Sequence, residues 1–322
     1  MRTKQVRGTI AYVTRFDFDA AMFSMLAVCY EYLPTKTVEA SGAKTVWVKS
    51  AGKEKECLSC MLLGNSLGDK NPPFLVFKTK PSVDKETARM NAALQHGFGG
   101  RPWNDLRGQQ DGVQIYGNTT GWWNSELSIQ FLLFHFWRRP NMREPILLLW
   151  DDFFGHWRQD VLIMARLLNV ELMKIPPRYT YVCQPADISW NKPFKDKMRA
   201  KWVEIRIRQL RQCSAGLLTK IPSPSRLDMI AWIKEAWSSI SRSVIVSGFI
   251  KAGFTDAVPI DVETASPSPE VHGNTQNPDW PLLIRLMRSL NMESPAINPT
   301  RDIDTLIENV AATVGDDNSQ SD

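Results

Sequence analysis

The amino-acid sequence predicts an α/β fold with a mixed central sheet and helices on both of its faces. Three observations support this prediction: β-rich runs joined by turns come first, helical and strand-like segments then alternate, and one short strand is apolar on both faces. The chain has 322 residues, of which 43% are hydrophobic and 23% charged, as in soluble globular proteins. This length predicts one large domain or two smaller ones.

The first part of the chain is rich in predicted strands. Residues 44–50 (KTVWVKS) and 57–65 (CLSCMLLGN) flank the charged turn AGKEKE, which predicts an antiparallel hairpin. A third strand, FLVFKT at 74–79, follows the turn signal GDKNPP. Residues 81–125 are mostly polar and rich in Gly, Asn and Gln, so we expect a loop-rich insertion there.

The second part alternates between helices and strands. The run ILLLW is apolar on both faces, as in a central strand that helices cover on both sides. Its neighbours have helical or strand spacing, and Pro140 ends the helix that precedes it. The predicted strands are 146–150 and 170–176, and the predicted helices are 124–140, 158–169, 187–211 and 226–253.

Charge is unevenly distributed along the chain. Residues 256–322 contain 12 acidic and 3 basic residues, a net charge of −9, whereas residues 1–255 carry a net charge of +14. A basic body favours polyanionic partners such as nucleic acids through counterion release, although a solvated basic surface would have the same count. We expect the last residues, GDDNSQSD, to be disordered.

The five cysteines and the apolar runs bear on the compartment. An odd number of cysteines without a secretory signal predicts a reducing compartment, and therefore a soluble intracellular protein. Cys57 and Cys60 form a CxxC pair, but no second pair completes a zinc site. The run AAMFSMLAV is too short to span a bilayer, which needs about 20 apolar residues.

Two acidic residues follow neighbouring predicted strands. Asp151 comes directly after the strand 146–150, and Asp187 lies in the connection after the strand 170–176. Ligand sites form beyond the carboxyl ends of parallel strands, so we expect both carboxylates at one edge of the sheet. Such a pair could hold Mg²⁺, and two such ions support phosphodiester chemistry. Asp187 could equally be the N-cap of the helix that follows.

The chain resembles the catalytic domain of pogo/Tigger-type, Tc1/mariner-related DDE transposases. These are DDE superfamily endonucleases, with relatives among centromere-protein-B-like proteins. The resemblance covers about residues 20–255, between a lead-in at 1–19 and an acidic, partly disordered tail at 256–322. It rests on the segments KTVEASGAKTVWVKSAGKEK, PPFLVFKTK, ILLLWDDFFGH and CQPADISWNKPFKDKMRAKW.

The resemblance implies a fold, an activity and a location. The fold is ribonuclease-H-like (the integrase/transposase fold), and the site is a DDE/D centre that takes Mg²⁺ or Mn²⁺. The activity is DNA strand cleavage and transfer in the nucleus. Family members commonly carry helix-turn-helix domains before the catalytic domain, and none is expected here, so we do not expect sequence-specific recognition of transposon ends.

The resemblance also implies roles for single residues. Asp151 matches the second acidic residue and Asp187 the third, 36 positions later. Asp152 follows the catalytic position, and we expect it to be a capping or solvated residue. His156 occupies the histidine position of the family's DxxxxH pattern, where a packed or hydrogen-bonded role is at least as plausible as a chemical one.

The first acidic position departs from the family pattern. The family places this acid in a strand-end motif like NMDxT, where this chain has MFSML, so that Ser24 stands at the acid position. A serine hydroxyl is neutral and a poor Mg²⁺ ligand, so the site is expected to lose one negative charge. Asp17 or Asp19 could substitute, but both lie upstream in a different register.

The predicted helix 187–211 combines an apolar face with a basic stripe. Trp190, Phe194, Met198, Trp202 and Ile205 fall on the apolar face. Trp122 and Trp123 could touch DNA, with ordinary packing as the alternative. The candidate phosphate contacts, each of which could instead be a plain solvated charge, are Lys192, Lys195, Lys197, Arg199, Lys201 and Arg206.

Three functions remain open from the sequence. The favoured one is a transposase-derived domain that binds DNA and whose Mg²⁺-dependent cleavage is weakened by Ser24. The alternatives are an active metal-dependent endonuclease and a non-catalytic protein-interaction remnant. We expect DNA as a partner, leave a homo-oligomer open, and expect neither a membrane nor a small-molecule cofactor.

Overall fold

The computed structural model describes residues 19–32, 56–137, 139–216 and 221–255. These residues belong to two compact units. The first unit contains 19–28, 57–199 and 224–255, and the second contains 29–32, 56 and the described part of 200–223. The predicted lead-in, the predicted strand 44–50 and the acidic tail lie outside the described residues, apart from Asp19.

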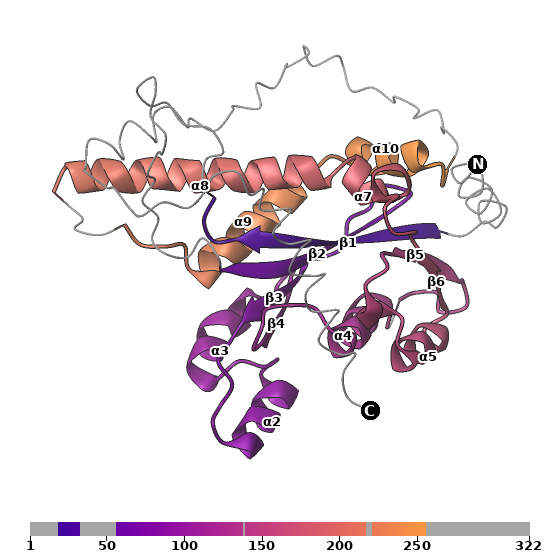
Figure 1. Ribbon diagram of the computed structural model, residues 1–322, viewed down its shortest axis with the longest axis horizontal. Helices are drawn as coiled ribbons and strands as arrows, with labels where there is room; N and C mark the ends of the chain where they lie inside the picture. Colours follow the sequence, from indigo (N-terminus) through magenta and orange to yellow (C-terminus); the bar gives the residue numbers. More distant parts are fainter. Residues whose placement is uncertain (1–18, 33–55, 138, 217–220, 256–322) are drawn as a thin grey trace, which may run out of the picture. The chain divides into compact units, whose positions relative to one another are not determined.

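Six strands form one sheet among the described residues, in the order β4-β3-β2-β1-β5-β6 (Figure 1). Strands β1, β5 and β6 run parallel, β3 and β4 run parallel, and β2 is antiparallel to β3. The predicted mixed α/β sheet is therefore confirmed. The strands are β1 (Asp19–Cys29), β2 (Cys57–Asn65), β3 (Phe74–Lys78), β4 (Gln114–Asn118), β5 (Ile146–Trp150) and β6 (Val170–Lys174).

Helices α4 (Ser125–Phe136) and α5 (Gln159–Leu167) cover one face of the sheet (Figure 1). Helix α4 begins where the side chain of Asn124 accepts a hydrogen bond from the Leu127 amide at 2.9 Å, which satisfies a free donor of the first turn. Buried aromatic and aliphatic side chains of both helices pack on Phe23 and Trp150. The α4 face of the sheet is therefore apolar.

The opposite face is covered by α7 (Pro185–Ile188), α10 (Arg242–Ala252) and the beginning of α8 (Asn191–Ser214) (Figure 1). Trp190, Phe194 and Met198 are all fully buried, as the apolar face of the predicted helix requires. The predicted helical segment 226–253 is two helices, α9 (Arg226–Ser238) and α10. It is interrupted because Ser241 accepts from the Val244 amide and starts a new helix.

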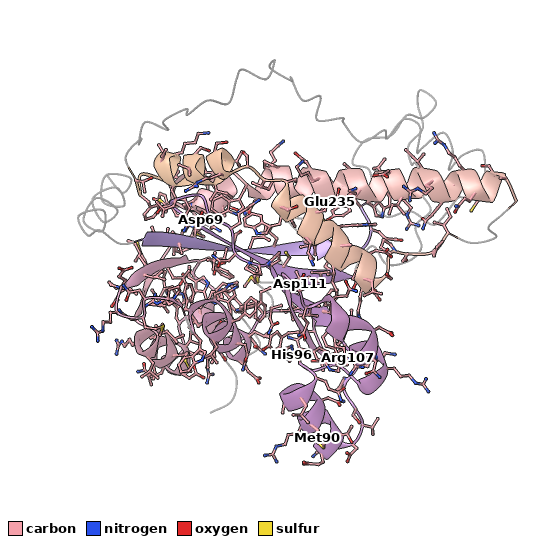
Figure 2. The ribbon with its side chains drawn as sticks, turned by 180° about the vertical axis from the view of Figure 1, so that it is seen from behind. Asp69, Met90, His96, Arg107, Asp111 and Glu235 are labelled. Atoms are coloured by element: carbon pink, nitrogen blue, oxygen red, sulfur yellow. The ribbon has the colours of Figure 1, made fainter. Side chains whose placement is uncertain are left out.

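The predicted loop-rich insertion is wrong in part. It contains α2 (Lys85–Leu94), α3 (Gly100–Leu106), a 3₁₀ turn at Arg107–Gln109 and strand β4. No residue of α2 is buried. A helix that buries no side chain does not need the regularly spaced apolar residues from which a helix is predicted. His96, which follows α2 (Figure 2), stacks on Tyr116 of β4, with 4.5 Å between the ring centroids. Strand β4 extends the sheet through its backbone pairing with β3. Its sequence does not show the alternation of apolar and polar residues that would predict a strand.

The remaining predicted strands and helices are confirmed, with shifted ends. The long helix begins at Asn191 rather than at 187, because the preceding residues form the separate short helices α6 (Thr180–Cys183) and α7. No helix in the described part of the chain is long and apolar enough to cross a membrane.

Candidate active site

Ser24 lies on β1, which pairs in parallel with β5, the strand that ends just before Asp151. The register pairs Ala21 with Leu148 and Met22 with Leu149; continued by two residues, it would set Ser24 opposite Asp151. Asp19 pairs with Ile146 at the other end of the same strands. Five residues of strand span about 16 Å, so the backbone places Asp19 too far away to supply the missing carboxylate. Asp17 lies outside the described residues.

Asp187 reaches the same edge from α7. The short helix starts with Pro185 at its first position, and α10 packs closely against it at Gly248. A Cβ atom at Gly248 would lie 2.6 Å from the Pro185 carbonyl oxygen, so a side chain there would displace α7. A glycine on α10 therefore helps to set the position of this carboxylate.

Asn191 bridges Ser24 and Asp187. Its Nδ2 donates to Asp187 Oδ1 at 2.6 Å and to Ser24 Oγ at 2.8 Å. Ser24 is only 1% exposed and Asn191 6% exposed, so these bonds lie away from solvent. The hydroxyl at the first acid position is thus an acceptor in a buried hydrogen-bonded cluster.

Burial raises the pKa of Asp187 above its ordinary value, and the nearby charge of Asp151 raises it further. Hydrogen bonds from Asn191 and Thr180 and the charge of Lys195 act in the opposite direction but do not cancel the effect of burial. The effect of the Asp151 charge on this pKa means that the two carboxylates lie near each other, and that they act as one site stays a prediction.

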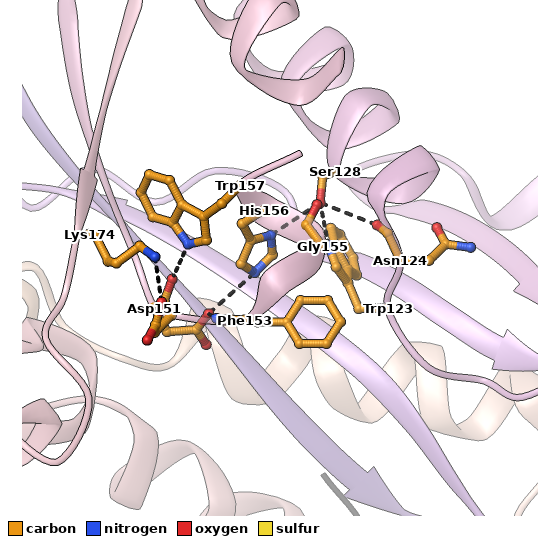
Figure 3. Close-up of polar contacts among 10 residues, drawn as sticks. Trp123, Asn124, Ser128, Asp151, Phe153, Gly155, His156, Trp157 and Lys174 are labelled. Carbon is orange, nitrogen blue, oxygen red and sulfur yellow. Dashed lines mark hydrogen bonds and ion pairs between the residues drawn. The ribbon is translucent and has the colours of Figure 1, made fainter. Parts of the chain in front are cut away.

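Residues of the loop after β5 hold Asp151 in place (Figure 3). Its Oδ1 accepts from the Phe153 amide at 3.1 Å and lies 3.4 Å from His156 Nε2. Its backbone carbonyl accepts from Trp157 Nε1 at 2.9 Å. The Asp151 side chain remains 29% exposed and can therefore meet a ligand.

Asp152 points to a different partner. Its Oδ1 lies 2.5 Å from Lys174 Nζ, and both side chains are largely exposed. Lys174 also lies over the ring of Trp157, 4.7 Å from its centroid. Asp152 is thus a solvated, ion-paired residue in this arrangement.

Asp151, Asp187 and Asn191 are the residues near this edge that could hold a divalent cation. Asn191 Oδ1 is buried and has no hydrogen-bond partner, which leaves an unsatisfied oxygen beside Asp187. Two carboxylates and an amide oxygen are the ligand types that Mg²⁺ or Mn²⁺ takes. No group of three or more His, Cys, Asp or Glu that could hold a metal occurs among the described residues. With Ser24 neutral, the charge needed to balance a pair of dications is lacking.

The predicted basic stripe is largely ion-paired. In the first unit, Lys192 and Arg199 both pair with Asp196, at 3.1 and 3.2 Å. Lys197 is exposed. Lys195 is half-buried, and its positive charge lowers the pKa of Asp187. Within this unit, Asp196 therefore neutralises part of the predicted basic stripe.

The second unit contains the other two predicted phosphate contacts. Lys201 lies 3.9 Å from Glu204. Arg206 is buried, forms an ion pair with Glu31, and donates to the Pro222 carbonyl at 3.1 Å. The prediction that Arg206 contacts phosphate conflicts with this burial, because helical spacing alone does not show which side of a helix is covered.

Two further sequence candidates are buried. Trp123 is 4% exposed and donates to Ser128, which agrees with the packing alternative, whereas Trp122 is 40% exposed. Cys60 is fully buried, and burial raises the pKa of its thiol far above the ordinary value. A thiol in this state is a weak nucleophile and a poor metal ligand.

Sequence reasoning missed Asn191, Thr180 and Ser128 as site residues. Asn191 stands inside the NKPF segment that carries the resemblance, so its place in the motif was an available signal. Ser128 and Thr180 come from segments whose patterns indicate only a helix and a connection. Their contacts with His156 and Asp187 depend on tertiary structure.

The sequence pattern of the DDE superfamily endonucleases matches residues 55–249. The human protein "Pogo transposable element with KRAB domain" is 27% identical over 255 residues, which cover 76% of this chain and 37% of that protein. Its mouse counterpart is 27% identical over 229 residues, covering 70% and 33%. The chain thus spans about a third of the length of these curated relatives.

Solved structures of a mariner transposase are also similar. The Mos1 mariner paired-end complex with Mn has a TM-score of 0.41 at 13% identity, covering 78% of this chain and 58% of that one. The catalytic domain of Mos1 mariner transposase has a TM-score of 0.35 at 12% identity, covering 78% and 86%. The family match spans well over half of this chain and includes Asp151, Asp187 and Asn191. We conclude that the chain belongs to the DDE superfamily endonucleases.

Proposed function

We propose that this transposase-derived DDE-type domain binds DNA and that its ancestral strand cleavage and transfer is weakened by Ser24. The observation that supports this most directly is the register that, continued by two residues, would set Ser24 opposite Asp151. Its hydroxyl accepts a hydrogen bond from Asn191, which also binds Asp187. A neutral hydroxyl in the place of a carboxylate lowers the negative charge available to a cation.

The chain's own residues keep part of the site. Asp151 and Asp187 would hold a single Mg²⁺ or Mn²⁺, which when bound would stabilise negative charge on a phosphodiester. Asn191 orients Asp187, and the loop after β5 orients Asp151. Without a third carboxylate, we expect the domain to bind DNA but to cleave it slowly.

Nicking of supercoiled DNA in Mg²⁺ or Mn²⁺ tests the catalytic part of the proposal. We expect little nicking by the unchanged chain and a gain of at least about 10-fold for Ser24→Asp, a small part of the acceleration that enzymes reach. Asp151→Asn in the Ser24→Asp chain should remove this gain. If the unchanged chain nicks efficiently, and Asp151→Asn abolishes that nicking, the chain is an active endonuclease and the proposal is wrong.

The DNA-binding part rests on the net charge of +14 over residues 1–255 and on the exposed cations of α8. We expect the affinity for duplex DNA to fall steeply with salt. Lys197→Gln should reduce the slope of log K against log salt by about 0.9, the value for one phosphate contact. Lys85→Gln, which removes an exposed lysine of α2, is the matched control and should leave the slope unchanged.

Asp196 allows a test of opposite sign. It is the acidic partner of both Lys192 and Arg199, so Asp196→Asn should free two cations for phosphate and strengthen DNA binding. Fluorescence anisotropy at two salt concentrations measures the change. DNA affinity that is insensitive to salt and to both variants would point to the protein-interaction alternative.

A further inference from the structure

We propose that His156 is a positioning residue for Asp151, held with its proton on Nε2 by a hydrogen-bond chain that begins at α4. The hydrogen bonds run from Trp123 to Ser128 and from Ser128 to His156, whose Nε2 lies 3.4 Å from the Asp151 carboxylate (Figure 3). The inference rests on the proposed function only in taking Asp151 as the ligand-binding carboxylate of the site.

The imidazole ring of His156 is fixed by its neighbours. His156 is completely buried and stacks on Trp150, with ring centroids 4.3 Å apart and planes 12° apart. Phe23 and Phe153 meet the ring edge-on, at 5.4 and 5.2 Å. Close packing on these sides leaves the ring one orientation, so its two nitrogens have defined partners.

Hydrogen-bond donors and acceptors determine the direction of the chain. Trp123 Nε1 can only donate, and it does so to Ser128 Oγ at 2.9 Å. Ser128 Oγ lies 3.1 Å from His156 Nδ1 and can donate its own proton there. The carbonyls of Asn124 and Gly155 compete for that proton, each at 3.2 Å.

The carboxylate decides between the two tautomers. His156 Nε2 faces Asp151 Oδ1 at 3.4 Å, too long or too bent for a hydrogen bond, and Nε2 has no other partner among the described residues. A lone pair on Nε2 would face a negatively charged oxygen in a buried setting, which is unfavourable, whereas an N–H there is attracted to it. The tautomer that fits these contacts therefore has its proton on Nε2 and accepts from Ser128 at Nδ1.

This arrangement fixes one oxygen of Asp151. Oδ1 accepts a hydrogen bond from the Phe153 amide and faces the N–H group of His156. Rotation of the carboxylate about its bond to Cβ is therefore restricted. The other oxygen, Oδ2, remains available to a ligand. Groups that orient a metal-binding side chain in this way are typically worth about 10- to 100-fold in metal affinity.

Nitrogen NMR of the full chain with ¹⁵N-labelled histidine, in EDTA at pH 8, tests the tautomer directly. The signals of His156 are those that disappear in His156→Phe. We expect a protonated Nε2 and an unprotonated Nδ1, and Ser128→Ala should shift Nδ1 and mix the tautomers. Ser247→Ala, which removes another helical serine bonded to a backbone carbonyl, is the control and should change nothing at His156.

A wild-type spectrum with the proton on Nδ1, or one unchanged by Ser128→Ala, would overturn the proposal. Should His156→Phe not fold, Trp123→Phe serves instead. It removes the donor to Ser128 and should move the same signals by a smaller amount.

Mn²⁺ binding, followed by electron paramagnetic resonance, tests the consequence for Asp151. We expect Ser24→Asp to bind Mn²⁺ more tightly than the unchanged chain, and Ser24→Asp with Ser128→Ala to bind about 10-fold more weakly than Ser24→Asp alone. Equal affinity of these two variants would contradict the positioning role. If Ser24→Asp shows no gain, the proposed role of Ser24 fails, whereas the NMR experiment still decides the role of His156.

Discussion

The two carboxylates of the candidate site are held in different ways. Asp151 is supported through His156 by a chain of ring contacts and hydrogen bonds on the α4 face. Asp187 is held on the other face by hydrogen bonds from Thr180 and from Asn191, which also binds Ser24. The Asp151 side is built on aromatic packing, whereas on the other side the uncharged Ser24 and Asn191 are hydrogen-bonded beside Asp187.

Ser24 is 1% exposed and accepts a hydrogen bond from Asn191, so the fold accommodates a neutral side chain at this position. The scaffold on the α4 face depends on apolar packing, which is independent of the charge at position 24. Variants on the two sides should therefore change stability independently.

The largest effect is expected on the Asp151 side, from Trp150→Ala. This ring is fully buried and packs on Phe23 and His156, so its loss should cost about 3–5 kcal/mol of unfolding free energy. Urea unfolding measures the change. Trp122→Ala, at an exposed position next to the same core, should cost far less; similar losses for both would mean that the α4 face is not the support we infer.

On the other side, Asn191→Leu should cost about 1–3 kcal/mol, because it leaves Ser24 Oγ and Asp187 without their buried donor. A double-mutant cycle with Ser24→Ala measures how much of this loss belongs to the Ser24 contact. A coupling energy near zero would mean that Asn191 serves Asp187 alone.

His135, near the Asp151 side, should make the fold sensitive to acid. Burial lowers its pKa to about 3, below the 6.5 of an exposed histidine. The unfolded chain takes up this proton first as pH falls, so stability is complete above pH 6.5 and declines by about 1.4 kcal/mol per pH unit below it. Thermal unfolding between pH 7 and 5 should show a shallower decline in His135→Leu; an equal decline would place the sensitivity elsewhere.

The smallest effect should come from Asp152→Asn. The Asp152–Lys174 pair is solvent-exposed, and such pairs contribute about 0–1 kcal/mol. We expect a change in melting temperature of no more than about 2–4 °C. A larger loss would show that Asp152, and not only Asp151, helps to build the site.

Much of the site's layout was predictable from local pattern. The strand ending at Asp151 is a continuous apolar run, and the segment around Asp187 resembles a family motif, so both carboxylates could be assigned. The helices and strand β4 within 81–125 could not be predicted, because α2 buries no side chain and β4 depends on backbone pairing with β3. Arg206 was misjudged because the sequence does not show that Glu31, 175 positions away, pairs with it.

The sequence by itself determined the α/β class, the two acids and the neutral residue at position 24, because periodicity and residue type are local properties. Only the tertiary structure decided that the register of β1 and β5, continued by two residues, would set Ser24 opposite Asp151, that Asn191 joins Ser24 to Asp187, and that Ser128 reaches His156 from α4. Apart from the Asn191–Asp187 bond, which spans four positions, these contacts join residues from 28 to 167 positions apart, and such pairs are set by how the sheet and its helices pack rather than by any local pattern.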